Sequence, residues 1–492
     1  MSIPVQFRYM TGLKRTIFRD ARLLGTWDAR GAASGEWSEM PMVEVTAEDG
    51  CPGFAALVQF DEAEAGKTFQ WSVRLSTASV ADVSGIPTEV NDANSAERVR
   101  SFELRLPTSD RQVEEYYFTY ARRLGARKFY VQGGAEDPAL RFGVWAPNAQ
   151  KVEVVFGDPT NGYIADDGHG IDASRAPLPM SRGADGIWQS APVSDFSALE
   201  GVPYMYRIVN AQGRTIFRTD ILSRQQIGRG THNPDGAHWA GDPSALDGTK
   251  SCSLIVSVDT VARDMSTPAG AQPMRIAEDD FWAHEFTPGL PVPSRVEDLV
   301  IYELHIGALA FDHDRPGNLE DAIALLAHLS DLGVNAIELL PMSEYSGIGW
   351  GYGDSHLFVI ESTAGGRDQY KHFVRECHRR GIAVIQDVVY NHFDPDAGRA
   401  QWAYDSDAPE QNIYYWYEGK AADYARAEDG YLDNGSSGFA PRFFGRDGAA
   451  AVREQRSGLH RRISRRRPAR GFDAGDAPGQ RAARRRPQHS RR

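Results

Sequence analysis

The chain has 492 residues, of which 41% are hydrophobic and 10% aromatic, and its net charge is −13. This length predicts two to four domains of a globular protein rather than one small core. No apolar run is as long as a membrane span, the N-terminus lacks the apolar core of a signal peptide, and the three cysteines lie far apart in sequence. We therefore expect a cytoplasmic protein without membrane contacts, a disulfide framework or a zinc site.

The charge is unevenly distributed. Residues 446–492 contain 15 arginines, no lysine and 4 acidic residues, a net charge of +11, so the total of −13 leaves −24 for residues 1–445. An acidic body does not favour nucleic acid as a partner.

Residues 1–110 alternate short β-rich runs with turn residues, a pattern typical of a small β-sandwich. Trp27, Trp37 and Trp71 are its conspicuous aromatic residues. Core packing is the more common role of a single tryptophan. The functional alternative is a platform on which the apolar face of a sugar ring stacks.

Residues 111–130 are rich in charge and are predicted to form a short helical connector. A second β-rich module follows over 131–240. It contains LRFGVWAPNAQKVEVVF from Leu140, DGIW ending at Trp188, and VPYMYRIVN from Val202. These three segments resemble the family-48 carbohydrate-binding module, which implies a β-sandwich and makes Trp145 and Trp188 candidate glucan-binding residues. The GTWD segment of the first module resembles starch-binding modules more loosely.

Residues 241–295 are a Pro-, Gly- and Asp-rich connector that we expect to wrap the following domain. From residue 298 the pattern alternates strands with helices. The predicted strands are 299–307, 334–341 and 382–389, and the predicted helices begin at the N-cap Asn318 and at residue 368. This order predicts right-handed parallel crossovers, as in a (β/α) barrel or an open doubly wound sheet.

Polar residues follow the predicted strands at their C-terminal ends. They are Glu303, His305, Glu338, Asp387, Asn391 and His392, and the loop after the second strand carries GWGYG at 349–353. Such residues can simply satisfy the backbone groups of loops. Their distribution over several strand ends nevertheless favours a barrel, whose site is built from these ends, and no GxGxxG motif supports a dinucleotide fold.

Four motifs, YELHIG, NAIELLP, WGY and DVVYNH, occur in this order. Together they resemble the α-amylase superfamily, glycoside hydrolase family 13, and within it the 1,4-α-glucan branching enzymes and their trehalohydrolase and debranching relatives. The resemblance implies a (β/α)8 TIM barrel that begins within residues 296–445, preceded by two β-sandwich modules.

The resemblance also implies roles for individual residues. Tyr352 corresponds to the aromatic residue that stacks on the sugar, Asp387 to an aspartate of the pocket floor and His392 to a histidine that binds the same sugar. Trp350 is a further substrate-binding candidate, and Asn391 corresponds to a structural or calcium-linked asparagine. Beyond this calcium, no cofactor is expected.

Retaining glycosidases need two carboxyl groups about 5 Å apart. The family supplies them after its fourth and fifth strands, and the fourth-strand motif G-x-R-x-D does not occur in this sequence. We therefore assign no catalytic residue and expect only the first three β/α units of an incomplete barrel. Its open sheet edge predicts poor folding beyond about Val296.

The arginine-rich tail, 446–492, has one aromatic residue and no apolar periodicity. Binding to a polyanion and simple disorder are two interpretations. We favour a third, a shift of reading frame near Gly445, because a one-base shift permits a fourth-strand motif of the family within 464–480. Resequencing the gene across Gly445 tests this hypothesis.

The sequence thus predicts an α-glucan-active transglycosidase of the branching type that is catalytically incomplete. The alternatives are a non-catalytic glucan-binding protein and a hydrolase of the α-amylase or maltooligosyl trehalose trehalohydrolase type. The expected partner is an α-glucan such as glycogen or starch, and nucleic acid and membranes are not expected partners.

Overall fold

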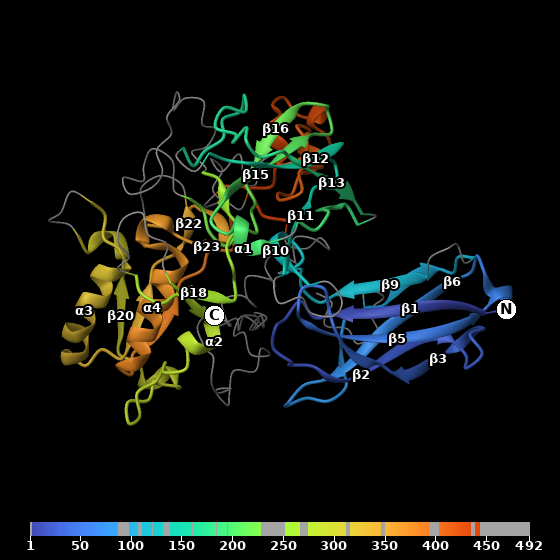
Figure 1. Cartoon of the computed structure of the whole chain (residues 1–492), viewed down its shortest axis with the longest axis horizontal. Helices are drawn as coiled ribbons and strands as arrows, with labels where there is room; N and C mark the ends of the chain where they lie inside the picture. The colour runs from blue at the N-terminus through green and yellow to red at the C-terminus, as the bar shows by residue number, and fades with distance from the viewer. Residues whose placement is uncertain are drawn as a thin grey trace, which may run out of the picture.

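The computed structural model describes residues 2–86, 98–106, 111–120, 122–130, 138–158, 161–183, 185–193, 195–227, 251–265, 274–310, 315–345, 350–392, 403–433 and 438–442. The arginine-rich tail, Gly445 and Gly349 lie outside these residues. The described chain is mostly β-sheet with few helices. It forms an N-terminal β-sandwich, a second β module and an α/β part (Figure 1). None of its described helices is long and apolar enough to cross a membrane.

The first sandwich consists of a sheet in the order β4-β5-β1-β9 and a sheet in the order β3-β2-β6-β7, with β8 paired to β6. Its strands are β1 (Ser2–Met10), β2 (Arg19–Trp27), β3 (Ala33–Pro41), β4 (Val43–Thr46), β5 (Pro52–Asp61), β6 (Thr68–Ser76), β7 (Val83–Ser84), β8 (Arg100–Glu103) and β9 (Gln112–Tyr117). Alternate residues of β1 and β6 are buried, so each strand contributes one face to the core.

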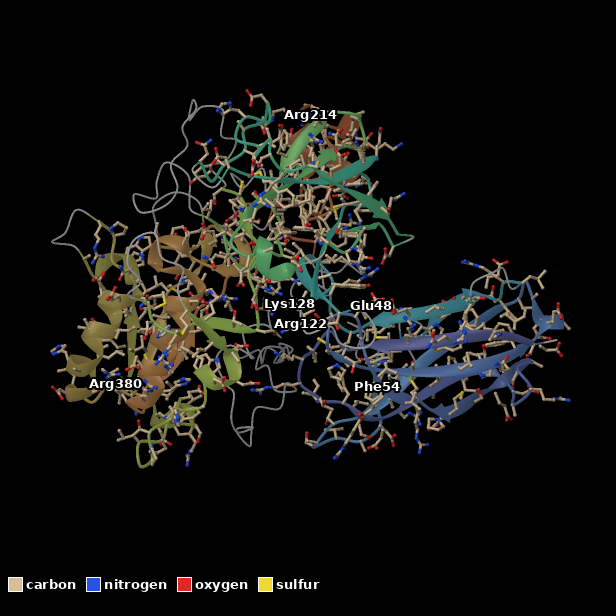
Figure 2. All side chains as sticks on the ribbon, in the orientation of Figure 1. Glu48, Phe54, Arg122, Lys128, Arg214 and Arg380 are labelled. Carbon is tan, nitrogen blue, oxygen red and sulfur yellow. The ribbon has the colours of Figure 1, made fainter. Side chains whose placement is uncertain are left out.

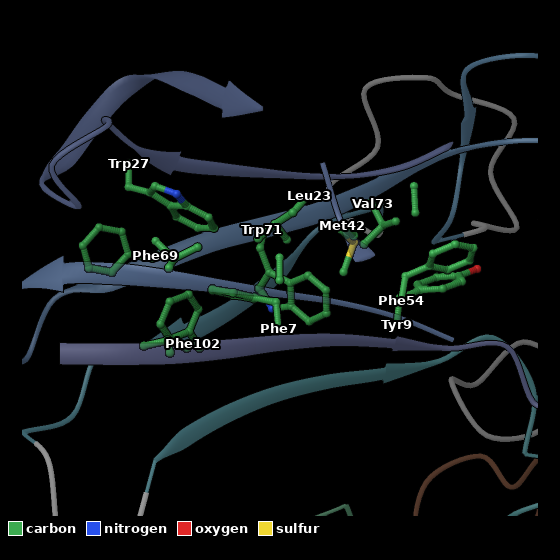
Figure 3. Close-up of a cluster of buried hydrophobic side chains, with 14 of the residues drawn as sticks. Phe7, Tyr9, Leu23, Trp27, Met42, Phe54, Phe69, Trp71, Val73 and Phe102 are labelled. Atoms are coloured by element: carbon green, nitrogen blue, oxygen red, sulfur yellow. The ribbon is translucent and has the colours of Figure 1, made fainter. Parts of the chain in front are cut away.

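The aromatic core of this sandwich corrects two predicted site residues (Figure 3). Trp27 is 3% and Trp71 1% exposed. The ring of Phe7 stacks on Trp27 at 5.2 Å and meets Trp71 edge-on at 5.3 Å. The prediction that Trp27 and Trp71 bind glucan is therefore wrong, because neither indole offers a face to a ligand. Trp37 is 42% exposed.

The helical connector predicted over 111–130 is also wrong. This segment contains β9 and the strand β10 (Gly125–Phe129). Strand β9 pairs in parallel with β1, and β10 pairs with the next strand, β11 (Ala139–Trp145). Each half of the segment pairs with the edge of a sheet in one of the two flanking modules. This pairing outweighs the helical preference that its charged composition suggested.

The second β module is one connected eight-stranded sheet in the order β10-β11-β14-β13-β12-β15-β16, with β17 paired to β15. Its remaining strands are β12 (Lys151–Phe156), β13 (Leu178–Arg182), β14 (Ile187–Ser190), β15 (Pro203–Val209), β16 (Thr215–Arg218) and β17 (Ser253–Leu254), and α1 (Phe196–Leu199) follows β14. Strand β13 pairs with both β12 and β14 and so connects the two halves of the module.

The two candidate tryptophans of this module serve its core. Trp188 is 7% exposed, and its indole nitrogen donates a hydrogen bond to the carbonyl oxygen of Ala146 over 2.9 Å. Its predicted role in glucan binding is therefore wrong. Trp145 is half-buried and packs against the same core.

An ionic cluster centred on Asp259 joins the sandwich to the second module. Figure 2 labels two of its cations, Arg122 and Lys128. The Asp259 carboxylate lies 3.1 Å from the Lys14 ammonium, 3.0 Å from the Arg122 guanidinium and 3.5 Å from the Lys128 ammonium. Burial raises the pKa of Asp259, but these three cations outweigh it and hold the pKa far below its usual range.

The α/β part contains a parallel three-stranded sheet in the order β20-β21-β24. Its elements are β20 (Ile301–Leu304), α3 (Leu319–Asp331), β21 (Ala336–Leu339), β22 (Ser343–Tyr345), β23 (Asp354–Ile360), α4 (Gly366–Arg379) and β24 (Ala383–Gln386). Asn318 caps α3 in a capping box with Asp321, and Gly333 follows the helix with φ +81°. The N-cap at Asn318 was predicted.

Strand β24 is shorter than the predicted 382–389 and only partly buried. Among the described residues it lies at one edge of the sheet and β20 at the other. Val300, Ile301 and Tyr302 beside the β20 edge are 53%, 47% and 40% exposed, as expected for an open apolar edge. Poor folding beyond Val296 stays a prediction.

The described part of the connector packs on α4. It contains β18 (Thr260–Ala262), β19 (Arg275–Ala277) and α2 (Glu278–Phe281). Phe281 and Trp282 join the core formed by α3, α4 and the parallel sheet. The guanidinium of Arg367 on α4 donates to the carbonyl oxygens of Ser257 and Thr260.

The segment after β24, residues 403–433 and 438–442, packs on the second β module. Tyr404 and Ile413 are part of the core of that module. The Arg218 guanidinium donates to the carbonyl oxygens of Ala403 and Tyr404, and Asn148 donates twice to the Asp405 carboxylate. The segment that follows the parallel sheet in sequence therefore packs on the second β module, which precedes the sheet in sequence.

Candidate functional site

Three carboxylates lie at the C-terminal edge of the parallel sheet. Glu303 of β20 and Glu338 of β21 are directly opposite in register. Asp387 follows β24, and its amide donates to the carbonyl oxygen of Leu339 over 2.9 Å. Because the three strands are parallel, their ends place these acids on one side of the sheet, as the sequence predicts.

Tyr352 lies beside these carboxylates, on the connection between β22 and β23. Its ring is 46% exposed, and its hydroxyl interacts with Asp387. Loss of solvation, the charge and hydrogen bonding of Asp387, and the charges of Glu303 and Glu338 raise the pKa of Tyr352. The structure thus brings together Tyr352 and Asp387, two of the predicted substrate-binding residues.

Gly351 fixes the path of this connection. It has φ +88°, and a Cβ atom at this position would lie 2.3 Å from the carbonyl oxygen of Pro341. Only glycine permits this close approach between the Tyr352 segment and the end of β21.

Trp350 forms an aromatic wall next to Tyr352. Its indole is 65% exposed, and its ring lies 5.1 Å from the imidazole of His305 at an interplanar angle of 38°. Much of the indole therefore faces solvent, while His305, the residue after β20, supports it. An exposed aromatic surface beside hydrogen-bonding carboxylates suits a sugar, which presents an apolar C–H face and a ring of hydroxyl groups.

His392 and Asn391 lie after β24, at the end of the described range 350–392. Nδ1 of His392 lies 2.9 Å from Oδ1 of Asn391, and Asn391 is exposed. Among residues 350–392 and the other described ranges, no group of three or more His, Cys, Asp or Glu side chains is arranged to hold a metal ion. Calcium near Asn391 thus stays a prediction, and no step below depends on it.

A small cavity lies beside His305, the residue that contacts Trp350. Its volume is about 100 Å³, and its lining includes His305, Gly307, Pro341, Tyr345 and Glu361. Binding pockets for small molecules usually enclose about 300–1,000 Å³, so this cavity suits a few water molecules rather than a sugar ring. The surface formed by Trp350, Tyr352 and the carboxylates is the better candidate for ligand binding.

Asp354 is a residue of the site that the sequence did not reveal. It is 1% exposed, and neither carboxylate oxygen has a hydrogen-bond partner among the described residues. Burial, followed by the charge of Asp387, raises the pKa of Asp354 well above its usual value. The only signal in the sequence was a single acid at the head of the apolar run DSHLFVI.

Replacing Asp354 by asparagine is expected to stabilise the fold at neutral pH. The unfolded chain releases the Asp354 proton above about pH 4, whereas the folded protein retains it to higher pH. The wild type therefore loses stability as pH rises above about 4, by up to about 1.4 kcal/mol per pH unit until the folded pKa is passed. Urea unfolding at pH 4 and pH 7 measures the difference. Asp331→Asn, at an exposed residue, is the control, and an equal gain at both pH values contradicts the assignment.

One family model matches the part of the chain that carries this site. Residues 293–433 match the family model described as the catalytic domain of alpha amylase. This match confirms the resemblance predicted from the four motifs.

Curated relatives match about half of this chain. A malto-oligosyltrehalose trehalohydrolase of Arthrobacter ramosus is 32% identical over 257 residues, 52% of this chain and 33% of the relative. A 1,4-alpha-glucan branching enzyme, GlgB 2, of Xanthomonas campestris pv. campestris (strain 8004) is 32% identical over 278 residues, 56% of this chain and 30% of the relative. The chain thus spans about a third of the length of these relatives.

Solved structures also match at low identity. A putative alpha amylase from Salmonella typhimurium is 20% identical, with a TM-score of 0.45, over 70% of this chain and 42% of that structure. The catalytic module of the pneumococcal glycogen-degrading protein SpuA, in complex with an inhibitor, is 19% identical, with a TM-score of 0.46, over 69% and 45%.

Proposed function

We propose that this chain, whose residues 293–433 belong to the α-amylase superfamily, binds an α-glucan such as glycogen or starch at the C-terminal edge of its parallel sheet. The observation that carries the proposal is the contact between Tyr352 and Asp387 beside Glu303 and Glu338, next to the exposed Trp350. Tyr352 stacks on one sugar ring, and Asp387 and His392 accept or donate hydrogen bonds to its hydroxyl groups. Trp350 contacts a neighbouring ring.

The reaction we propose for this site is glucan transfer of the branching type. Held against Tyr352, a sugar ring can be fixed near its transition-state geometry, which is how positioning groups contribute to catalysis. One relative is named a branching enzyme and another a trehalohydrolase. Hydrolysis of the α-amylase or trehalohydrolase type is therefore the alternative reaction.

A second candidate function is glucan binding without turnover. The sequence contains no G-x-R-x-D motif, and we assign neither a nucleophile nor a proton donor. Retaining cleavage requires both carboxyl groups. Under this second candidate function the chain binds glucan without cleaving it, and iodine staining of amylose incubated with the protein distinguishes it from glucan transfer. A change in the stain that scales with protein concentration would show turnover.

Tyr352→Ala is expected to weaken binding of maltoheptaose at least about tenfold, which corresponds to about 1.4 kcal/mol. Isothermal titration of wild type and variant measures the change, and retardation in a glycogen-containing gel tests the polymer. Trp37→Ala removes an exposed aromatic residue of the first sandwich and serves as the matched control. Loss of binding in Trp37→Ala but not in Tyr352→Ala would place the glucan site on the sandwich and refute the proposal.

A further inference from the structure

The hairpin β22–β23 carries Trp350 and Tyr352 in its connection. Strands β22 and β23 pair through Tyr345 with Asp354 and through Glu344 with His356. All seven residues of β23 are buried. In Figure 1 the hairpin lies between the three-stranded sheet and the second β module. The position of the aromatic wall therefore depends on what holds this hairpin.

A buried hydrogen bond links the second β module to the hairpin. Oγ1 of Thr219, one residue after β16, lies 3.0 Å from Nε2 of His356. Both side chains belong to fully buried residues. Thr219 and His356 are 137 residues apart in sequence, so this contact is purely tertiary.

The surrounding hydrogen bonds determine the direction of this bond. The Ser355 hydroxyl donates to the carbonyl oxygen of Glu344 over 2.9 Å and lies 3.0 Å from Nδ1 of His356. Because its single proton is used, the Ser355 hydroxyl accepts from Nδ1–H. Nε2 of the neutral imidazole is then an acceptor, and the Thr219 hydroxyl donates to it. These hydrogen bonds connect Thr219 of the second module, through His356 and Ser355, to the backbone of Glu344 in β22.

A cation–π contact and apolar contacts support the same interface. The Arg224 guanidinium lies 4.3 Å from the centre of the Phe358 ring. Leu357 and Phe358 of β23 form a cluster with Tyr415 and Tyr431, against which Leu222 of the second module packs. The module and the segment after β24 thus pack against β23, and the hydrogen bond between Thr219 and His356 is part of this contact.

We propose that the second β module positions the glucan-binding hairpin and that Thr219, through His356, is a positioning residue that sets the glucan affinity of the site. This inference rests on the proposed function. It assigns the module a role in glucan binding that does not require a sugar to touch the module. Without the Thr219 hydroxyl, the buried hydrogen bond from the second module to Nε2 of His356 is lost, and the hairpin is held less firmly against the module.

Thr219→Val tests this inference because valine keeps the shape of threonine and removes the hydroxyl. We expect maltoheptaose to bind Thr219→Val about fivefold more weakly than wild type, and Thr219→Ser, which keeps the donor, to bind within twofold of wild type. Tyr404→Phe is the matched control, because it removes a hydrogen bond to the backbone oxygen of Thr219 without touching His356. It is expected to lower the thermal midpoint but to leave the affinity within twofold.

Amide hydrogen exchange gives a readout that does not depend on glucan. Peptides covering 350–360 are expected to exchange at least about threefold faster in Thr219→Val than in wild type or Thr219→Ser. Thr219→Ala provides the same test if valine prevents folding. Unchanged exchange in these peptides, or unchanged affinity while wild type binds, would overturn the inference and leave the proposed function intact. Faster exchange in a protein whose wild type binds no maltoheptaose would instead refute the proposed function.

Discussion

Tyr404→Ala is expected to destabilise the second β module by about 3–5 kcal/mol, the usual cost of deleting a large buried aromatic side chain. Tyr404 is 1% exposed, its ring meets Tyr414 edge-on at 5.6 Å, and its hydroxyl donates to the carbonyl oxygen of Thr219 over 3.0 Å. Alanine leaves a cavity in the core of the module and an acceptor without its donor. The thermal unfolding midpoint and urea unfolding measure the loss.

Tyr424→Ala is the control for this variant, because Tyr424 lies in the same segment but is half-exposed. We expect it to cost less than about 1 kcal/mol. If both variants cost the same, the segment 403–433 does not belong to the core of the second module.

Arg367→Met is expected to destabilise the α/β part by about 3–5 kcal/mol, as when one partner of a buried ion pair is removed. The Arg367 side chain is 2% exposed, and its guanidinium binds the Asp368 carboxylate at 2.8 and 3.0 Å in addition to the two connector carbonyls. Burial raises the pKa of Asp368, but Arg367, Arg275 and the Ala262 amide lower it to about 2. Urea unfolding at pH 7 measures the cost.

The pH dependence of this ion pair gives a further check. The lowered pKa of Asp368 stabilises the folded protein above the unfolded value near 4, and this stabilisation is lost as pH falls through about 2. Wild type should therefore lose more stability between pH 4 and pH 2 than Arg367→Met. Arg367→Lys keeps the charge without the planar fork and should be intermediate. An identical acid response in wild type and Arg367→Met would contradict the role of the pair.

The sequence predicted the α/β part best, where local chemistry and tertiary contacts agree. The capping box at Asn318 and the glycine at 333 define α3, and the apolar runs before Glu338 and Asp387 are parallel strands. The polar strand ends meet at one edge because parallel strands leave no other arrangement. Tyr352 and Asp387 are thereby brought together from 35 residues apart.

The features that the sequence did not predict depend on contacts between residues far apart in the chain. Residues 111–130 became strands because β1 and β11 offered edges. Trp27, Trp71 and Trp188 are buried in cores. The sequence pattern of an alternating strand is the same whether its tryptophan faces a core or a ligand. Thr219 and His356 have no local signature, since their contact exists only once the second module and the hairpin have docked.

The most direct test of the account is a crystal structure of the protein with maltoheptaose. We expect one glucose ring stacked on Tyr352, with hydroxyl groups within hydrogen-bonding distance of Asp387 and His392, and a neighbouring ring against Trp350. An oligosaccharide bound only to the first sandwich or the second module, with Tyr352 and Trp350 bare at saturating ligand, would contradict it.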